Sequence, residues 1–274
     1  ISSKNNMNLV GTIADAITGA YLLGKEVIKK EDANQLLFSA GVVKTIKKKE
    51  IDGKDVFSHV IPEGSSIKVP SEITGSNSFG AEDGKMVKII DREFGRDAAV
   101  DSINKAFMLG TLYLTRKGYT LSLQDLNVSN KVKEITAEII QNVEKKTMQV
   151  IEDYKSGNLE SLPGKTAEET RETKILQLLN EVRTEVAEVV KQYFPADGNV
   201  NKMVTPKAAG SMLNITQIGC VVGQQALGGK RINFGYTGRT LSFFKREDLG
   251  PEARGFIKNS FFHGLNPKEF FFGA

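Results

Sequence analysis

Two long stretches of the chain carry apolar residues at helical spacing. The first stripe consists of Val132, Ile135, Ile139, Val143, Val150/Ile151 and Tyr154. The second consists of Ile175, Leu178/Leu179, Val182, Val186, Val189/Val190 and Tyr193. Both follow the 3.6-residue period of an α-helix. A connection of about ten residues containing Gly157 and Pro163-Gly164 separates them, so we predict an antiparallel helical hairpin over residues 129–193.

Capping residues support the same boundaries. Ser129 can cap the first helix, and Thr166 with Glu169 forms the S/T-x-x-E pattern of a capping box before the second. The narrow stripes fit either a coiled-coil interaction arm or ordinary core packing, and the pattern does not choose between them.

The first 120 residues mix helical and strand patterns. Helical spacing covers residues 8–22, 33–40 and 96–115, with a further short helix from about residue 54 that ends at Pro62. Residues 66–69 and 85–90 have strand patterns separated by turn residues. We therefore predict an α+β fold class: a mixed α/β region, then the long antiparallel hairpin, then a mostly helical or irregular C-terminal segment.

Composition excludes several classes of protein. Among 274 residues there are one cysteine and two histidines, which excludes a disulfide framework and leaves little for His-based catalysis or metal binding. No apolar run approaches the roughly 20 residues that span a bilayer, and no signal peptide opens the sequence. The start at Ile1 and the three phenylalanines at 270–272 suggest a piece of a longer chain, because such a tail would expose much apolar surface.

Positive charge is concentrated in the last quarter. The net charge of the chain is +4, and residues 199–274 alone carry ten Lys and Arg against four Asp and Glu, an excess of +6. This excess suits phosphates or nucleotides, or an acidic partner subunit. The charge count does not separate these alternatives.

The segment 210–231 is the richest in candidate chemistry. Its end resembles a phosphate-binding P-loop, but Gln224 stands where the first glycine belongs and Arg231 where the Mg²⁺-binding hydroxyl belongs, which excludes that motif. Asn214, Gln217, Gln224 and Gln225 interrupt an apolar run. Buried amides need partners, so these side chains either bond to local backbone or line a wet channel. By the same two readings, Lys230 and Arg231 are either surface cations or part of the channel lining.

The remaining reactive side chains give weak signals. Cys220 lies between Gly219 and Val221, without a nearby histidine, and is expected to be a small buried apolar residue. His59 and His263 have no partner motif, so we interpret both as structural.

Ordered motifs in the C-terminal part resemble a known family. They are LNEVR (179–183), GSMLNI (210–215), GQQ (223–225), GKRI (229–232), RTL (239–241), PEARGFI (251–257), NSF (259–261), GL (264–265) and PKEFFF (267–272). This series resembles the largest subunit of multisubunit DNA-directed RNA polymerase, in its archaeal and eukaryotic form. The first 120 residues resemble the pore region of that family more loosely.

The resemblance implies a place in the polymerase. It divides the chain into a pore-like region (1–120), a funnel region (121–260) whose helical hairpin spans about 129–193, and a lead-in to the bridge helix (261–274). Together these would form the secondary channel through which nucleoside triphosphates enter, with the hairpin as docking surface for a transcript-cleavage factor. The implied partners are the other polymerase subunits, the rest of the largest subunit, nucleoside triphosphates, DNA and RNA, with no membrane.

The resemblance also implies site residues. The positions that match a toxin-contacting wall near the active centre in eukaryotic relatives are Asn180, Arg183, Leu213, Gln217, Gln224, Gln225, Gly229 and Lys230. We add Asn214, Arg231 and Arg239 to this channel wall, and expect Lys230, Arg231 and Arg239 to attract the triphosphate. Ala226 and Gly273 replace a serine and a histidine of the eukaryotic enzyme, so toxin binding is not expected and the chain has an archaeal character.

The resulting expectation is a non-catalytic part of a nucleotidyltransferase. The family's Asp-rich metal loop does not occur in this sequence, so we expect no cofactor here, Mg²⁺ bound elsewhere in the complete enzyme, and no activity of the chain alone. An archaeal chain would be cytoplasmic and a eukaryotic one nuclear. The alternatives are a free-standing helical-hairpin interaction module, which explains only residues 129–193, and a basic nucleic-acid-binding domain.

Overall fold

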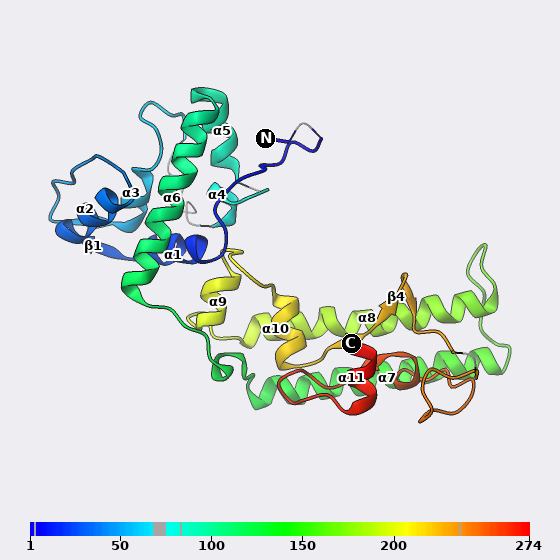
Figure 1. The fold of residues 1–274 in the computed structure, drawn as a ribbon. Coiled ribbons are helices and arrows are strands. Elements are labelled where there is room, and N and C mark those ends of the chain that lie inside the picture. The colour runs from blue at the N-terminus through cyan, green and yellow to red at the C-terminus, as the bar shows by residue number, and fades with distance from the viewer. Residues whose placement is uncertain (3, 68–74, 83, 236) are drawn as a thin grey trace. The chain divides into compact units, whose positions relative to one another are not determined.

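The computed structural model describes residues 1–2, 4–67, 75–82, 84–235 and 237–274 (Figure 1). These residues divide into two compact units. Unit 1 comprises residues 1–125 and 195–211, and unit 2 comprises residues 126–194 and 212–274. The described residues are mostly helical and include three small two-stranded sheets. The predicted α+β class is therefore confirmed. The divisions predicted at residues 120 and 260 stay predictions.

Unit 1 is built around a helix crossing. Its elements are α1 (Asp15–Leu23), β1 (Val27–Lys29), α2 (Lys30–Ser39), β2 (Glu50–Asp52), α3 (Gly53–Ser58), α4 (Ser76–Phe79), α5 (Lys85–Phe94), α6 (Arg96–Lys117) and α9 (Asn199–Val204). A short 3-10 helix, η1 (Leu123–Leu126), leads out of it. Helix α1 packs across α6, and β1 pairs antiparallel with β2 with Ile28 opposite Ile51. The core side chains Leu23, Leu37, Phe57 and Leu109 are buried.

The sequence interpretation of unit 1 was partly wrong. Residues 85–90, predicted as a strand, lie in helix α5. Met86, Val87 and Ile90 are its buried residues, a spacing that fits one helical face and not the alternation of a strand. The other predicted strand, 66–69, falls partly in residues 68–74, outside the described residues. The strands β1 and β2 were not predicted.

The first predicted helix, 8–22, begins later than expected. It starts at Asp15, and the preceding backbone forms bridges from Asn8 to Glu82 and from Thr12 to Gly80. Leu9 is 75% exposed, although the helical pattern predicted burial. Backbone pairing with residues 80–82 therefore overrides the local helical pattern. The helices predicted at 33–40, from residue 54 and at 96–115 are confirmed as α2, α3 and α6.

Unit 2 contains the predicted hairpin. Helices α7 (Asn130–Lys155) and α8 (Ala167–Tyr193) run antiparallel side by side (Figure 1). The other elements are α10 (Met212–Gly219), β3 (Gly223–Gln224), β4 (Ala226–Leu227), β5 (Lys230–Arg231), η2 (Glu252–Arg254), β6 (Phe256–Ile257) and α11 (Pro267–Gly273). Strand β3 pairs with β6, and β4 with β5. Helix α10, β3 and β5 pack on α8, so α8 contacts both its hairpin partner and the C-terminal segment.

The buried stripe of α7 differs in detail from the prediction. Thr136 and Thr147 are buried in it, whereas Ile135 and Ile139 are only half-buried. A search for apolar residue types passes over threonine, although its methyl group packs like that of valine. Most of the stripe predicted for α8 is buried, namely Ile175, Leu179, Val182, Val186 and Val190. In the pairs Leu178/Leu179 and Val189/Val190, the second residue is the buried one.

The N-terminus of α8 has the predicted capping box. Thr166 Oγ1 accepts a hydrogen bond from the Glu169 backbone N–H at 3.2 Å, and Glu169 Oε2 accepts one from the Thr166 N–H at 2.9 Å. We expect Thr166→Ala to lower the free energy of unfolding of the chain by about 1 kcal/mol, because the backbone N–H of Glu169 at the helix end loses its hydrogen-bond partner. Urea denaturation followed by circular dichroism measures this. Thr166→Ser keeps the hydroxyl and should remain near wild type; equal losses in both variants would contradict the capping role.

Candidate functional site

The segment 210–231 folds against helix α8. Gly223 has φ of +85°, and a Cβ added to it would lie 2.7 Å from Cγ of Arg183. Any larger residue at position 223 would therefore push this arginine away from β3. Arg183 in turn donates from Nη2 to Oδ1 of Asn180 at 3.1 Å, one turn earlier on α8. Asn180, Arg183 and Gly223 are thus neighbours in the fold.

The two glutamines of that motif have different surroundings. Gln224 is 2% exposed, and its Nε2 donates to the carbonyl oxygens of Gln225 at 2.6 Å and Arg254 at 2.8 Å. Gln225 is half-buried, with its Nε2 3.4 Å from the carbonyl oxygen of Gly223. Of the two readings left open for these amides, bonding to backbone holds for Gln224. Its carboxamide joins β3 to the turn before β6.

The other channel-wall candidates range from exposed to half-buried. Leu213, Asn214, Gly229 and Lys230 are exposed, and Gln217 and Arg239 are half-buried. Gly228 and Gly229 both have positive φ, which turns the chain tightly from β4 to β5 and leaves Lys230 at the surface. Arg239 Nη1 donates to the carbonyl oxygen of Ser242 at 3.3 Å. All eleven candidates lie in unit 2.

Of the two interpretations of Arg231, surface cation or channel lining, the surface cation is wrong, because the side chain is buried. It is 2% exposed and forms a two-pronged ion pair with Glu172 of α8, with Nε 3.0 Å from Oε2 and Nη2 3.1 Å from Oε1. Its Nη1 donates to the carbonyl oxygen of Leu249 at 3.2 Å. Because the Glu172 carboxylate is paired with its guanidinium group, Arg231 contributes less to the positive electrostatic potential at the surface than the sequence suggested.

Glu172 gathers two further arginines that the sequence did not reveal. Arg171 Nη2 lies 2.9 Å from Glu172 Oε1, and Arg254 Nη2 lies 3.6 Å from Glu172 Oε2. Both arginines are buried, at 3% and 4% exposed. Glu172 and Arg171 are adjacent in the charge-rich helix α8, and Arg254 is 82 positions beyond Glu172. We call Glu172 with these three arginines the arginine cluster.

Opposing effects set the proton affinities in the arginine cluster. Burial alone would raise the pKa of Glu172, but hydrogen bonds and positive charge from Arg231, with the charge of Arg254, outweigh it and lower the pKa below its ordinary value. The pKa of Arg254 is lowered, first by desolvation and then by the charges of Arg231 and Arg171, against the attraction of Glu172. The cluster is therefore a charged network in which cations outnumber anions.

A second buried carboxylate fastens the C-terminal helix. Glu269 is 3% exposed and accepts hydrogen bonds from the backbone N–H groups of Lys258 at 3.0 Å, Asn259 at 3.1 Å and Asn266 at 3.1 Å. The amide Nδ2 of Asn259 adds another at 2.8 Å. Burial raises its pKa, but these hydrogen bonds prevail and lower it. Glu269 thereby holds α11 against the segment after β6.

The cysteine and the histidines have local surroundings. Burial raises the pKa of the half-buried Cys220 thiol to about 11, so it is protonated at neutral pH and is a poor nucleophile. His59 Nδ1 lies 2.6 Å from the carbonyl oxygen of Asp55, and His263 Nδ1 lies 2.8 Å from Ser260 Oγ. These contacts agree with structural roles for both histidines.

Comparison with known protein families gives the chain its place. Residues 1–126 match RNA polymerase Rpb1, domain 3, and residues 150–257 match RNA polymerase Rpb1, domain 4. The chain belongs to the RNA polymerase largest-subunit family. The family resemblance inferred from the C-terminal motifs is thus confirmed, and it extends over unit 1 as well.

Similar largest-subunit proteins come from archaea. DNA-directed RNA polymerase subunit Rpo1N of Methanothermobacter thermautotrophicus is 35% identical over 299 residues, which cover 97% of this chain and 34% of that protein. The protein of the same name from Halobacterium salinarum is 34% identical and covers 100% of this chain and 31% of its own length. The chain thus spans about a third of the length of these relatives. Their origin agrees with the archaeal character expected from Ala226 and Gly273.

Within this largest-subunit chain, membership of the family does not assign roles to single residues. The eleven channel-wall assignments remain predictions. The structure shows which of these side chains are accessible to solvent and which are buried. Among the described residues, no helix has both the length and the apolar character that crossing a membrane requires.

Proposed function

We propose that this chain is a non-catalytic part of a DNA-directed RNA polymerase, a nucleotidyltransferase, and forms the secondary channel through which nucleoside triphosphates reach the active centre. The observation that carries the proposal is the match to two domains of the largest subunit, which together account for residues 1–126 and 150–257. A free-standing hairpin module would account only for residues 129–193.

The proposal assigns a task to each part of the chain. The α7–α8 hairpin is the docking surface for a transcript-cleavage factor. Lys230, Leu213 and Asn214 are exposed in unit 2 and line the channel, with the half-buried Gln217, Gln225 and Arg239. The buried Gln224 and Arg231 support this wall from within. The Mg²⁺ of the polymerase is held by another part of the enzyme, and the partners are the other subunits, DNA and RNA, in the cytoplasm of an archaeal cell.

Lys230 gives the proposal a direct test. Its ammonium group is exposed at the β4–β5 turn, where it attracts the triphosphate without bonding to it permanently. In the assembled polymerase, Lys230→Gln combined with Gln225→Ala should raise the nucleotide concentration for half-maximal elongation about threefold at low salt. The maximal rate should change less, because the chemistry takes place elsewhere.

The matched control is Lys245→Gln, which removes the same charge from an exposed lysine of the same unit. It should leave the nucleotide dependence unchanged. Elongation by the Lys230 and Gln225 double variant that follows the wild-type nucleotide dependence would reject the channel-wall role.

A further inference from the structure

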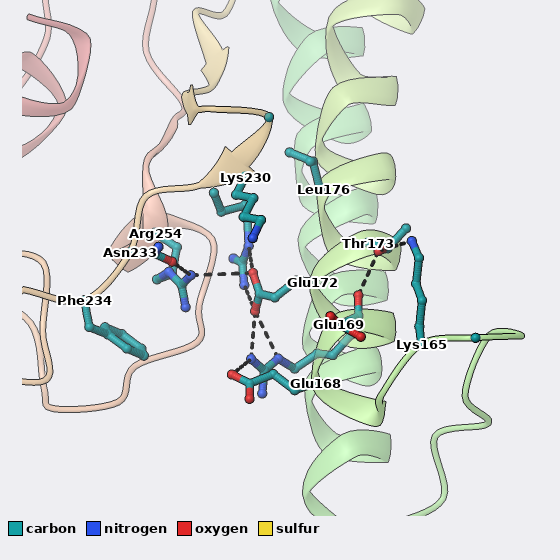
Figure 2. Close-up of a pocket in the computed structure, with 14 residues that line it drawn as sticks. Lys165, Glu168, Glu169, Glu172, Thr173, Leu176, Lys230, Asn233, Phe234 and Arg254 are labelled. Atoms are coloured by element: carbon teal, nitrogen blue, oxygen red, sulfur yellow. Dashed lines mark hydrogen bonds and ion pairs between the residues drawn. The ribbon is translucent and has the colours of Figure 1, made fainter.

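A cavity of about 600 Å³ lies beside the arginine cluster (Figure 2). Its walls come from the first turns of α8, from the β5 strand and the loop after it, and from Arg254. Figure 2 shows Glu172 on α8, with Lys230 and Arg254 approaching it from the C-terminal segment. All these residues belong to unit 2. Three residues of the proposed channel wall, Gly229, Lys230 and Arg231, also line this cavity.

The lining of the cavity has more positive than negative side chains. The cations are Lys165, Arg171, Lys230, Arg231 and Arg254. The anions are Glu168, Glu169 and Glu172, which leaves a formal excess of two positive charges. Two of these anions are weak counter-ions, since the side chain of Glu168 is 71% exposed and Glu169 is engaged in the capping box. Buried guanidinium groups without full compensation are unfavourable, so the cavity favours an anion.

Unused donors accompany this charge excess. Within the described part of the chain, Nη1 of Arg171 and Nη1 of Arg254 donate no hydrogen bond, whereas their Nε and Nη2 atoms bind protein oxygens. Both side chains line the cavity and contact the same Glu172 carboxylate. The Lys230 ammonium forms no ion pair within 4 Å among the described residues and stands at the open side. A bound anion could accept hydrogen bonds from all three groups.

The size and charge of the cavity select the class of anion. A phosphate monoester carries about −1.5 to −2 at pH 7, which matches an excess of two better than the single charge of a carboxylate. Guanidinium N–H groups form charge-assisted hydrogen bonds with phosphate oxygens. A volume of 600 Å³ exceeds what a bare phosphate needs, and Phe234 and Leu176 add an apolar wall. The Phe234 ring lies 4.5 Å from the Arg254 guanidinium carbon, which orients both groups.

We propose that this cavity binds the phosphate group of a small phosphorylated compound, held by Arg171, Arg254 and Lys230. Glu172 is the counter-ion that the two arginines share, and Phe234 with Leu176 contacts the rest of the compound. The site stands on these residues alone and does not depend on the role of the chain in nucleotide entry.

Titration of the 274-residue chain with inorganic phosphate tests the site. Isothermal calorimetry at constant ionic strength should give saturable binding with about one site per chain, as expected for a single cavity. Arg254→Gln should weaken binding about tenfold, because it removes a charge-assisted hydrogen bond. Lys230→Gln should weaken it about threefold, since this cation is exposed and partly screened.

Controls separate the cavity from general cationic attraction. Lys245→Gln removes an exposed charge away from the cavity and should bind phosphate like wild type. Lys230 is exposed, so its variant keeps its fold even if Arg254→Gln does not, and circular dichroism verifies this for each sample. Absence of saturable binding, or equal affinities of the Lys230→Gln and Lys245→Gln variants, would overturn the proposal.

A variant with the opposite expected sign sharpens the test. Glu172→Gln raises the formal excess in the lining from two to three positive charges. Phosphate should therefore raise the melting temperature of this variant more than that of wild type. A smaller rise than in wild type would contradict the cavity site. Because no nucleotide or nucleic acid is present, failure of the channel proposal would leave this result unaffected.

Discussion

Replacing Glu172 with glutamine is expected to lower the free energy of unfolding of unit 2 by roughly 3 kcal/mol, one of the largest effects in the chain. The substitution keeps the shape of the side chain but removes the carboxylate between three arginines. Arg171, Arg231 and Arg254 are all less than 5% exposed, so water cannot replace the lost charge. Three buried cations would then repel one another, and the two-pronged bond that joins Arg231 to α8 would be lost.

Glu168→Gln is the matched control for this prediction. Glu168 lies on the same helix one turn earlier and also contacts Arg171, with Oε1 3.3 Å from its Nη2, but its side chain is 71% exposed. We expect its loss to cost less than about 0.5 kcal/mol, as for other exposed ion pairs. Urea denaturation in phosphate-free buffer compares the two variants. Similar stabilities of Glu168→Gln and Glu172→Gln would show that the arginine cluster does not hold the unit together.

The stability difference between wild type and Glu172→Gln should depend on pH. The pKa of Glu172 is lowered in the folded chain from the reference value of 4.5. Its stabilising effect is therefore complete above pH 4.5 and is lost as the pH falls through the lower folded pKa. The stabilities of wild type and Glu172→Gln should differ most near neutral pH and converge in acid. A difference that stays constant down to the acid limit would contradict the ionic explanation.

The parts of the fold that the sequence predicted are those fixed by local chemistry. Helices α6, α7 and α8 have long apolar periods, and Ser129 and Thr166 cap the last two through hydrogen bonds within three residues. The errors lie where contacts with segments distant in sequence determine the local conformation. Asn8 pairs with Glu82 and Thr12 with Gly80, and the helix begins only at Asp15. The Lys85–Ile90 run was short enough to fit either period, and its packing on α6 selects the helix.

The candidate site shows the same division. Segment 210–231 stood out because amides, glycines and cations break an apolar run. The arginine cluster did not, because its members lie far apart in sequence and each resembles an ordinary surface charge. Arg231 and Glu172 are separated by 59 positions, and only the folded chain brings them together. Which amide is buried was equally hidden: Gln224 and Gln225 are neighbours, and strand geometry directs one inward.

Gly19→Ala is expected to destabilise unit 1 by about 3 kcal/mol, near the upper end of the range for an overpacked core. Helix α1 crosses α6 at this residue, and a Cβ on Gly19 would lie 1.9 Å from the carbonyl oxygen of Gly110. The contact is reciprocal, because a Cβ on Gly110 would lie 2.2 Å from the carbonyl oxygen of Ala16. Both obstacles are helix backbone, which cannot rotate away as a side chain can. The helices must separate, which disturbs buried neighbours such as Leu23 and Leu109.

Two measurements identify this crossing as the cause. Alanine is the better helix former by about 1 kcal/mol, so any loss of stability in Gly19→Ala must come from the crossing. Gly41→Ala is the control in the same unit: its φ is +77° and no atom lies within 4 Å of the added Cβ, so backbone strain alone should cost about 1 kcal/mol. Urea denaturation measures the loss of stability, and amide hydrogen exchange should show protection falling first in α1 and α6. A Gly19→Ala protein as stable as wild type would mean that α1 and α6 do not approach as closely in solution as the structure shows.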